Sequence, residues 1–244
     1  MLKLATKFAP DPCSFEMAHS AGFRHAELFL SGPILVDWQT ICRHARKYPN
    51  SYALHFPNQL DLPPEALDAI VALYRNLGCG SLIVHQPMLD KYREALLRLE
   101  PELQFAVENH RLTKDGFSRW AEENPGLALD VEHLWKFTCA DGPLEDLLEQ
   151  LASFLNRFGH KLRHVHMPGY WPGFKEHRPM YCARDLVFPV LSLLAESEFK
   201  GLVVSEVDMQ FQNPMELQMD VLLFKAWREE WDQELQRDQA TKTD

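Results

Sequence analysis

Four ionisable residues between positions 108 and 206 each stand at the end of a short apolar run. They are Glu108 after LQFAV, Asp130 after LAL, His166 after LRHV and Glu206 after LVVS. Three carboxylates and one imidazole form a hard, mostly oxygen donor set, which favours Mn²⁺ or Mg²⁺, with Zn²⁺ and Co²⁺ as alternatives. A buried carboxylate has to be paired, protonated or bound to metal. We therefore expect these residues to bind one divalent metal, against the alternative of solvated strand ends or ion pairs.

Two histidines in the first half of the chain occupy matching positions. His55 and His85 each begin an HxP motif at the end of a strand-like run. A lone histidine there is usually structural, but the matched pair favours a site, so we expect both to contact substrate. Glu27 in HAELFL is equally consistent with a site residue and with a structural one.

Two further histidines lie close to the candidate ligands. His133 follows Asp130 by three residues and is placed to bind a second metal or a substrate oxygen. His164 shares the inward face of its strand with His166, one layer lower, where it would pack or support the ligand.

The longest connection, residues 167–183, begins directly after His166. A loop of this length in a compact domain is usually functional or disordered. We expect Lys175, His177 and Arg178 to hold a substrate hydroxyl or phosphate, against the alternative of a solvated basic loop. Trp171 would supply an apolar wall to the site or pack the loop.

The elements that must position these residues alternate along the chain. Short strand-like runs begin near residues 2, 25, 52, 81, 103, 127, 162 and 201. Between them lie amphipathic segments typical of helices, roughly 12–20, 37–47, 63–77, 89–99, 112–123, 143–158, 184–198 and 214–236. Helical crossovers make the strands parallel, and eight such units match an α/β fold, the (β/α)8 TIM barrel. A doubly wound open sheet is the alternative.

The barrel would gather the candidate residues at one mouth, where the carboxyl ends of the strands meet. Read with period two, Gln104, Ala106 and Glu108 share a small and polar face that suits a narrow barrel interior. We read residues 1–244 as a single domain with a polar tail from about Gln236. The last helix carries Phe224, Trp227, Trp231 and Leu235 at helical spacing, which indicates core packing or contact with a second copy in a homo-oligomer.

Composition and charge restrict the class of protein. The chain has 244 residues, 46% of them hydrophobic, and a net charge of −10, which makes nucleic acid and anionic membranes unexpected partners. The five cysteines are scattered and never form a CxxC pair, as in proteins of a reducing compartment. No signal-peptide pattern and no apolar run near the ~20 residues of a membrane span is present. We therefore expect a cytoplasmic location.

Taken in order, these motifs resemble the xylose isomerase-like barrel superfamily over nearly the whole chain. The residues that carry the resemblance are HFP at 55–57, His85, Glu108-Asn109, the DxxH of Asp130 and His133, VHMPG around His166, EHRPMYCARDLVFPVL with His177, and GLVVSEV with Glu206. The superfamily includes sugar epimerases, hydroxypyruvate isomerases, inosose dehydratases and apurinic-site endonucleases. The chain departs from its patterns at Lys175, at Gly169 and at Cys182-Ala183-Arg184.

The resemblance implies two different metal centres. In the epimerase branch, positions like Glu108, Asp130, His166 and Glu206 bind one divalent metal, and the two glutamates also move protons. In the endonuclease branch, positions like His55, His85, His133 and His177 join them to hold three zinc ions. Lys175 replaces an acidic residue that the third zinc would need.

We expect a metal-dependent isomerase or epimerase of a small polyhydroxy carbonyl compound, a sugar or sugar phosphate, acting through an enediolate. Glu108 and Glu206 would be the catalytic acid and base, while His133 with Lys175 or Arg178 would orient substrate oxygens. A zinc-dependent phosphodiester hydrolase and a sugar-binding barrel without turnover are the alternatives.

Overall fold

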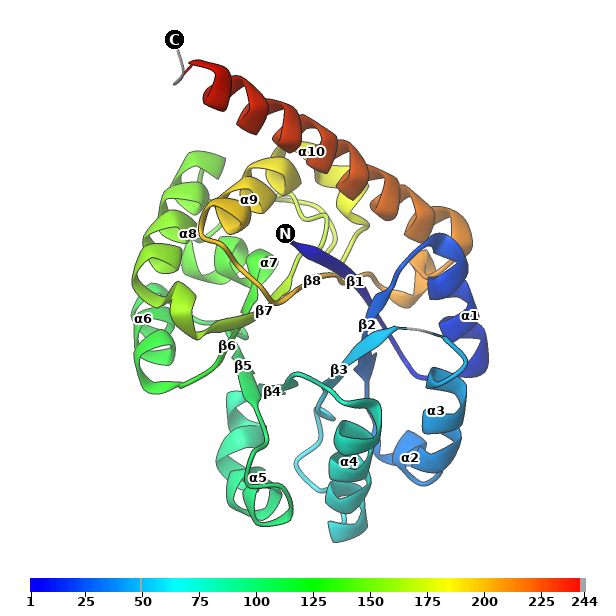
Figure 1. Cartoon of the computed structure of the whole chain (residues 1–244). Helices are drawn as coiled ribbons and strands as arrows, with labels where there is room; N and C mark the ends of the chain where they lie inside the picture. The colour runs from blue at the N-terminus through cyan, green and yellow to red at the C-terminus, as the bar shows by residue number, and fades with distance from the viewer. Residues whose placement is uncertain (49, 242–244) are drawn as a thin grey trace.

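Eight parallel strands close into one barrel in the computed structural model, which describes residues 1–48 and 50–241 (Figure 1). In chain order they are β1 (Lys3–Phe8), β2 (His25–Phe29), β3 (Ser51–His55), β4 (Leu82–His85), β5 (Phe105–Glu108), β6 (Leu127–Asp130), β7 (Leu162–His166) and β8 (Leu202–Ser205). The barrel closes because β1 pairs with both β2 and β8. The predicted TIM barrel is confirmed, and the open doubly wound sheet is excluded.

Helices surround the barrel and connect successive strands. The main ones are α1 (Pro12–Ala21), α3 (Trp38–Ala45), α4 (Pro64–Leu77), α5 (Gln86–Leu99), α6 (Lys114–Glu123), α8 (Leu144–Phe158), α9 (Arg184–Glu196) and α10 (Pro214–Thr241). Each corresponds to a helix predicted from the sequence. Helix α10 runs through the predicted polar tail to Thr241, and its early residues Phe224 and Trp227 are buried in the core.

Local sequence signals explain several helix boundaries. The carboxylate of Asp11 caps α1 by accepting hydrogen bonds from the backbone N–H groups of Cys13 and Ser14. Pro64 occupies the first turn of α4, and Gly78 ends that helix in the left-handed conformation at φ 60°.

Several short elements were not predicted. They are α2 (Gly32–Leu35), α7 (Val131–His133), a π-helix at Leu134–Thr138, and short 3₁₀ turns at Gly159–Lys161, Met180–Ala183 and Met209–Phe211. The turn at Met180–Ala183 ends the long loop that follows β7. Among the described residues, no helix is long and apolar enough to cross a membrane.

The interior of the barrel has a thin apolar layer with a charged layer above it. Ala53, Ile83, Ala106 and Ala128 form a separate small apolar cluster inside the ring. The residues two positions later on the same strands point the same way because side chains alternate along a strand. These residues are His55, His85, Glu108 and Asp130, at the carboxyl end of the barrel.

Candidate metal and substrate site

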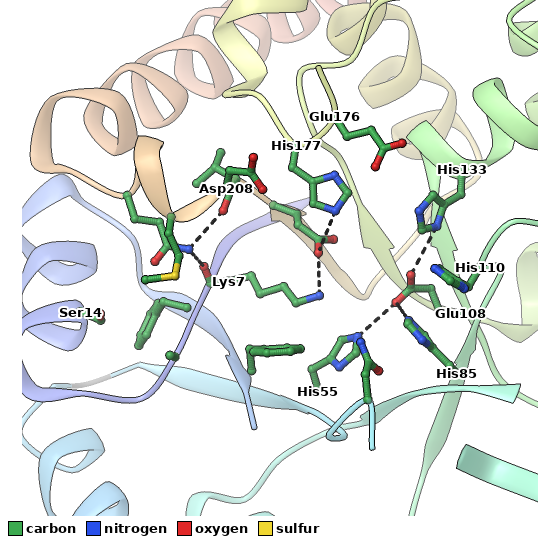
Figure 2. Close-up of a pocket in the computed structure, with 18 of the residues that line it drawn as sticks. Lys7, Ser14, His55, His85, Glu108, His110, His133, Glu176, His177 and Asp208 are labelled. Carbon is green, nitrogen blue, oxygen red and sulfur yellow. Dashed lines mark hydrogen bonds and ion pairs between the residues drawn. The ribbon is translucent and has the colours of Figure 1, made fainter. Parts of the chain in front are cut away.

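Every strand contributes one ionisable side chain to the carboxyl-end mouth of the barrel. In strand order they are Lys7, Glu27, His55, His85, Glu108, Asp130, His166 and Glu206, the last one residue after the end of β8. A cavity of about 450 Å³ opens above them and is lined by Lys7, His55, Glu108 and Glu206, among others (Figure 2). The mouth is therefore a charged floor under a space that suits a small molecule.

The three predicted carboxylate ligands meet around Nδ1 of the fourth ligand, His166. The Nδ1 atom of His166 lies 2.9 Å from Oε2 of Glu206, 3.5 Å from Oε2 of Glu108 and 4.0 Å from Oδ2 of Asp130. Among the described residues, neither His166 Nδ1 nor Glu206 Oε2 has a hydrogen-bond partner, although both are buried. Buried polar atoms are normally satisfied, so this pair and its oxygen-rich surroundings fit a divalent metal.

Glu27 orients the imidazole of His166. Its Oε2 atom lies 2.8 Å from Nε2 of His166 and 2.5 Å from Nε2 of His164, and all three side chains are fully buried. If Nε2–H is donated to Glu27, the Nδ1 lone pair of His166 would be directed to the candidate metal position. Glu27 and His164 therefore support the candidate ligand from below.

Three histidines besides His166 surround Glu108. The Nε2 atoms of His55 and His85 lie 3.2 and 3.3 Å from its Oε2 atom, and Nδ1 of His133 lies 3.5 Å from its Oε1 atom. His133 is also 3.5 Å from Oδ2 of Asp130. His55, His85 and Glu108 thus form a second ligand group beside the first, with Glu108 common to both.

Charges in the site hold two glutamates ionised. Burial raises the pKa of Glu108, but His166 and hydrogen bonds from histidines outweigh it and hold the pKa well below its usual value. The pKa of Glu206 is likewise low, because His166 and Lys7 outweigh the effect of burial.

The pKa values of Asp130 and His133 are raised instead of lowered. Burial raises the pKa of Asp130 to about 6, with the negative charges of Glu206 and Glu108 adding to it. Although burial lowers the pKa of His133, Asp130 and Glu108 raise it to about 9. Without a metal, the protonation states of these residues depend on one another. A bound cation would compete with the protons for the carboxylates.

The loop after β7 brings one of its predicted residues into the cavity. His177 lines the cavity, has a left-handed backbone at φ 55°, and places Nε2 3.7 Å from Oε1 of Glu206. Its backbone N–H donates a 3.0 Å hydrogen bond to the buried carboxylate of Glu132. A strained backbone anchored on a buried acid is typical of a functional position.

The other predicted loop residues lie outside the cavity. The side chain of Lys175 is 67% exposed and pairs with Asp208 at 3.4 Å. Arg178 lies over the ring of Phe174 at 5.1 Å, and Trp171 packs on its edge against Trp135. Contact of Lys175, Arg178 and Trp171 with a substrate stays a prediction.

Lys7 is the main site residue that the sequence reasoning missed. Its Nζ atom lies 2.7 Å from Oε1 of Glu206 and 3.2 Å from Oε1 of Glu27. Burial lowers the pKa of Lys7, but the surrounding glutamates raise it above its usual value. The period-two pattern of KLATKF, which puts Lys3, Ala5 and Lys7 on one face, was the available signal. Glu132 and His110, which stacks on His85 at 4.5 Å, were also missed.

Comparison with solved structures finds the same fold in sugar epimerases and in an endonuclease. A D-tagatose 3-epimerase-like protein is 14% identical with a TM-score of 0.70, over 96% of this chain and 100% of that one. An L-ribulose 3-epimerase is 14% identical with a TM-score of 0.58, over 95% and 97%. Endonuclease IV from Thermus thermophilus is 15% identical with a TM-score of 0.62, over 93% and 99%.

The chain shares the fold of the xylose isomerase-like barrels. The fold that the resemblance implied is thus confirmed. No family model matches the chain, and a search of curated proteins also finds no match. At these identities the likeness concerns the fold, and the reaction of this barrel has to be argued from its site.

Proposed function

We propose that the protein is a divalent-metal-dependent isomerase or epimerase of a small polyhydroxy carbonyl compound. The observation that carries the proposal is the convergence of Glu108, Asp130 and Glu206 on Nδ1 of His166 at the floor of the cavity. The epimerases among the solved structures of the same fold support it. Mn²⁺ or Mg²⁺ suits this donor set best.

The two glutamates are the acid and base of the proposed reaction. A bound divalent ion would supply Lewis acidity to a carbonyl oxygen and an adjacent hydroxyl. One of Glu108 or Glu206 takes the proton from the carbon beside the carbonyl, and the other returns a proton to that carbon or to its neighbour. His133 and His177 border the same cavity and would orient hydroxyl groups.

Proton exchange tests this role directly. Wild-type protein loaded with Mn²⁺ is screened against sugars, keto sugars and their phosphates for deuterium wash-in from heavy water. Glu206→Gln keeps the shape of the side chain and removes the base, so exchange should fall by about 10²–10⁴-fold. The exposed Glu122, paired with Arg157, supplies the control variant Glu122→Gln, which should exchange normally. Unchanged wash-in in Glu206→Gln with metal still bound would reject the role.

A zinc-dependent phosphodiester hydrolase is the second candidate. His55 and His85 converge on Glu108 and complete a second ligand group, and endonuclease IV has the same fold. The net charge of −10 argues against a nucleic-acid substrate. Metal analysis separates the candidates: about one Mn²⁺ or Mg²⁺ per chain supports the isomerase, and two or three zinc ions support the hydrolase.

A small sugar-like substrate and a cytoplasmic location belong to the same proposal. The five cysteines, at 13, 42, 79, 139 and 182, are all free, which supports a reducing compartment.

A further inference from the structure

Lys7 is part of a closed ring of contacts formed by four neighbouring strands. Its Nζ atom contacts Oε1 of Glu206, and Oε2 of Glu206 lies 2.9 Å from Nδ1 of His166. Nε2 of His166 contacts Oε2 of Glu27, and Oε1 of Glu27 returns to Lys7 at 3.2 Å. The ring fixes the ammonium group beside two candidate metal ligands, His166 at the end of β7 and Glu206 directly after β8.

The ammonium group is directed into the cavity. Lys7 lines the cavity, and Figure 2 shows its side chain extending across the floor toward Glu108. An ammonium group has three N–H donors. One donates to Oε1 of Glu206, and Oε1 of Glu27 lies 3.2 Å away as an ion-pair partner without a hydrogen bond. These two carboxylates leave at least one donor without an acceptor, at a side chain that lines the cavity.

No other lysine or arginine occupies a comparable place among the described residues that line the cavity. Arg111 is the only other lysine or arginine there, and it lies at the rim over the ring of Phe137, at 5.7 Å. Nearby Lys136 and Lys175 are paired with Glu176 and Asp208. Among the described residues, Lys7 is thus the one lysine or arginine held on the floor of the cavity.

We propose that Lys7 is a catalytic residue that donates a hydrogen bond to the oxyanion formed on the substrate. The inference rests on the proposed isomerase function. When the C–H bond beside the carbonyl breaks, the proton goes to Glu108 or Glu206, and the electron pair moves onto the carbonyl oxygen. The ammonium N–H stabilises that oxygen and keeps its own proton, as preorganised donors do in other sites.

An enediolate mimic tests the contact without knowledge of the substrate. Glycolohydroxamate carries a planar oxyanion, and its binding to Mn²⁺-loaded protein is measured by calorimetry. Lys7→Met should weaken hydroxamate binding by about 10²-fold, on the scale of losing one oxyanion donor. Mn²⁺ should bind Lys7→Met at least as tightly as wild type, because a neighbouring positive charge is removed. Lys161→Met, a partly buried lysine at the amino end of β7, is the matched control and should match wild type.

The outcomes separate this inference from the proposed function. Hydroxamate affinity within twofold of wild type in Lys7→Met, with Mn²⁺ bound, would show that Lys7 only compensates charge on Glu27 and Glu206. Wild-type protein that binds neither Mn²⁺ nor hydroxamate would overturn the isomerase proposal as well. If Lys7→Met fails to fold, the double variant Lys7→Met/Glu27→Gln is compared with Glu27→Gln, because the double variant removes two opposite charges together. Hydroxamate affinity should again fall by about 10²-fold. An unchanged affinity would refute the contact.

Trapping with borohydride tests whether Lys7 instead acts as a nucleophile. An imine requires a neutral amine, whereas two carboxylates hold the ammonium form here. Treatment with dihydroxyacetone and borohydride should add no mass at Lys7. A stable adduct on a peptide containing Lys7 would overturn the donor role.

Discussion

Glu27 determines which nitrogen atom of His166 is free to bind a metal. It lies 2.8 Å from Nε2 and is fully buried, so turning the ring would break this contact inside the barrel. Glu27→Gln replaces that charge with an amide. Mn²⁺ affinity should fall by about 10–100-fold, as is usual when the partner of a metal-binding histidine is removed. Competition with a fluorescent chelator measures the change.

The exposed pair Glu122–Arg157 again supplies the control, because Glu122→Gln keeps the same chemistry away from the barrel mouth. An affinity for Mn²⁺ in Glu27→Gln within twofold of wild type would show that Glu27 does not orient the ligand.

The sequence predicted the candidate ligands better than their supporting residues. Glu108, Asp130, His166 and Glu206 all end apolar runs, and parallel strands bring such ends together. The ion pairs of Lys7 were not predictable in this way, because lysine is rarely buried and pairing across 199 residues leaves no local pattern. The positive charge that Lys7 adds to the site was therefore found only in the structure.

The loop after β7 returns to its starting point through one close backbone contact. Gly169 donates its N–H to the carbonyl oxygen of Arg178 at 2.7 Å. A Cβ atom at position 169 would lie 1.8 Å from the carbonyl oxygen of Pro179, so the loop has to separate to admit one. This contact explains why glycine stands at position 169.

Gly169→Ala should therefore displace the segment that carries His177 and lower the free energy of unfolding by roughly 1–3 kcal/mol. Chemical denaturation measures the loss. Gly159→Ala has no atom within 4 Å of the added methyl group and should stay within about 0.5 kcal/mol of wild type. Equal stability of the two variants would contradict the close contact.

Asp220 attaches α10 to the barrel and makes this attachment depend on pH. Its carboxylate accepts hydrogen bonds from the hydroxyl of Ser205 on β8 and from the backbone N–H of Tyr181. Burial raises the pKa of Asp220 to about 6 from 3.8. The folded state thus disfavours the ionised form, and this contribution to stability is complete below pH ~4 and lost as the pH rises through ~6.

Asp220→Asn removes this titration. The stability of the variant relative to wild type should therefore increase between pH 4 and pH 7, by about 3 kcal/mol for a pKa shift of this size. Urea unfolding of both proteins across this range provides the measurement. A difference that does not vary with pH would mean that Asp220 has no raised pKa.

The periodicity of apolar residues in the sequence predicted the strands and the long helices but not the short elements. The segment Gly32–Leu35 is a single turn, too short for a helical period to register. The π-helix at Leu134–Thr138 follows a side-chain cap, in which Asp130 accepts a hydrogen bond from the backbone N–H of His133. That cap depends on where β6 ends in three dimensions.

A metal at the proposed site would tie together half of the barrel. Its four ligands come from β5, β6, β7 and the residue after β8, so binding would link neighbouring strands that otherwise interact through backbone hydrogen bonds. Mn²⁺ at 100 times its dissociation constant should add about 2.7 kcal/mol to the free energy of unfolding. Thermal melts with added Mn²⁺ and with a chelator show the effect as a shift of Tm.

Asp130→Asn should abolish most of that shift, while Asp61→Asn, a fully exposed residue paired with Lys91, should preserve it. A shift of equal size in Asp130→Asn would place the metal elsewhere.

The pairing of β1 with β8, which closes the barrel, sets the order in which the site can form. Lys7 lies near one end of the chain and Glu206 near the other, yet their side chains meet 2.7 Å apart where the barrel closes. A ribosome adds Glu206 199 residues after Lys7. The contact between them, and with it the proposed catalytic centre, therefore cannot form until all eight strands of the barrel have been synthesised.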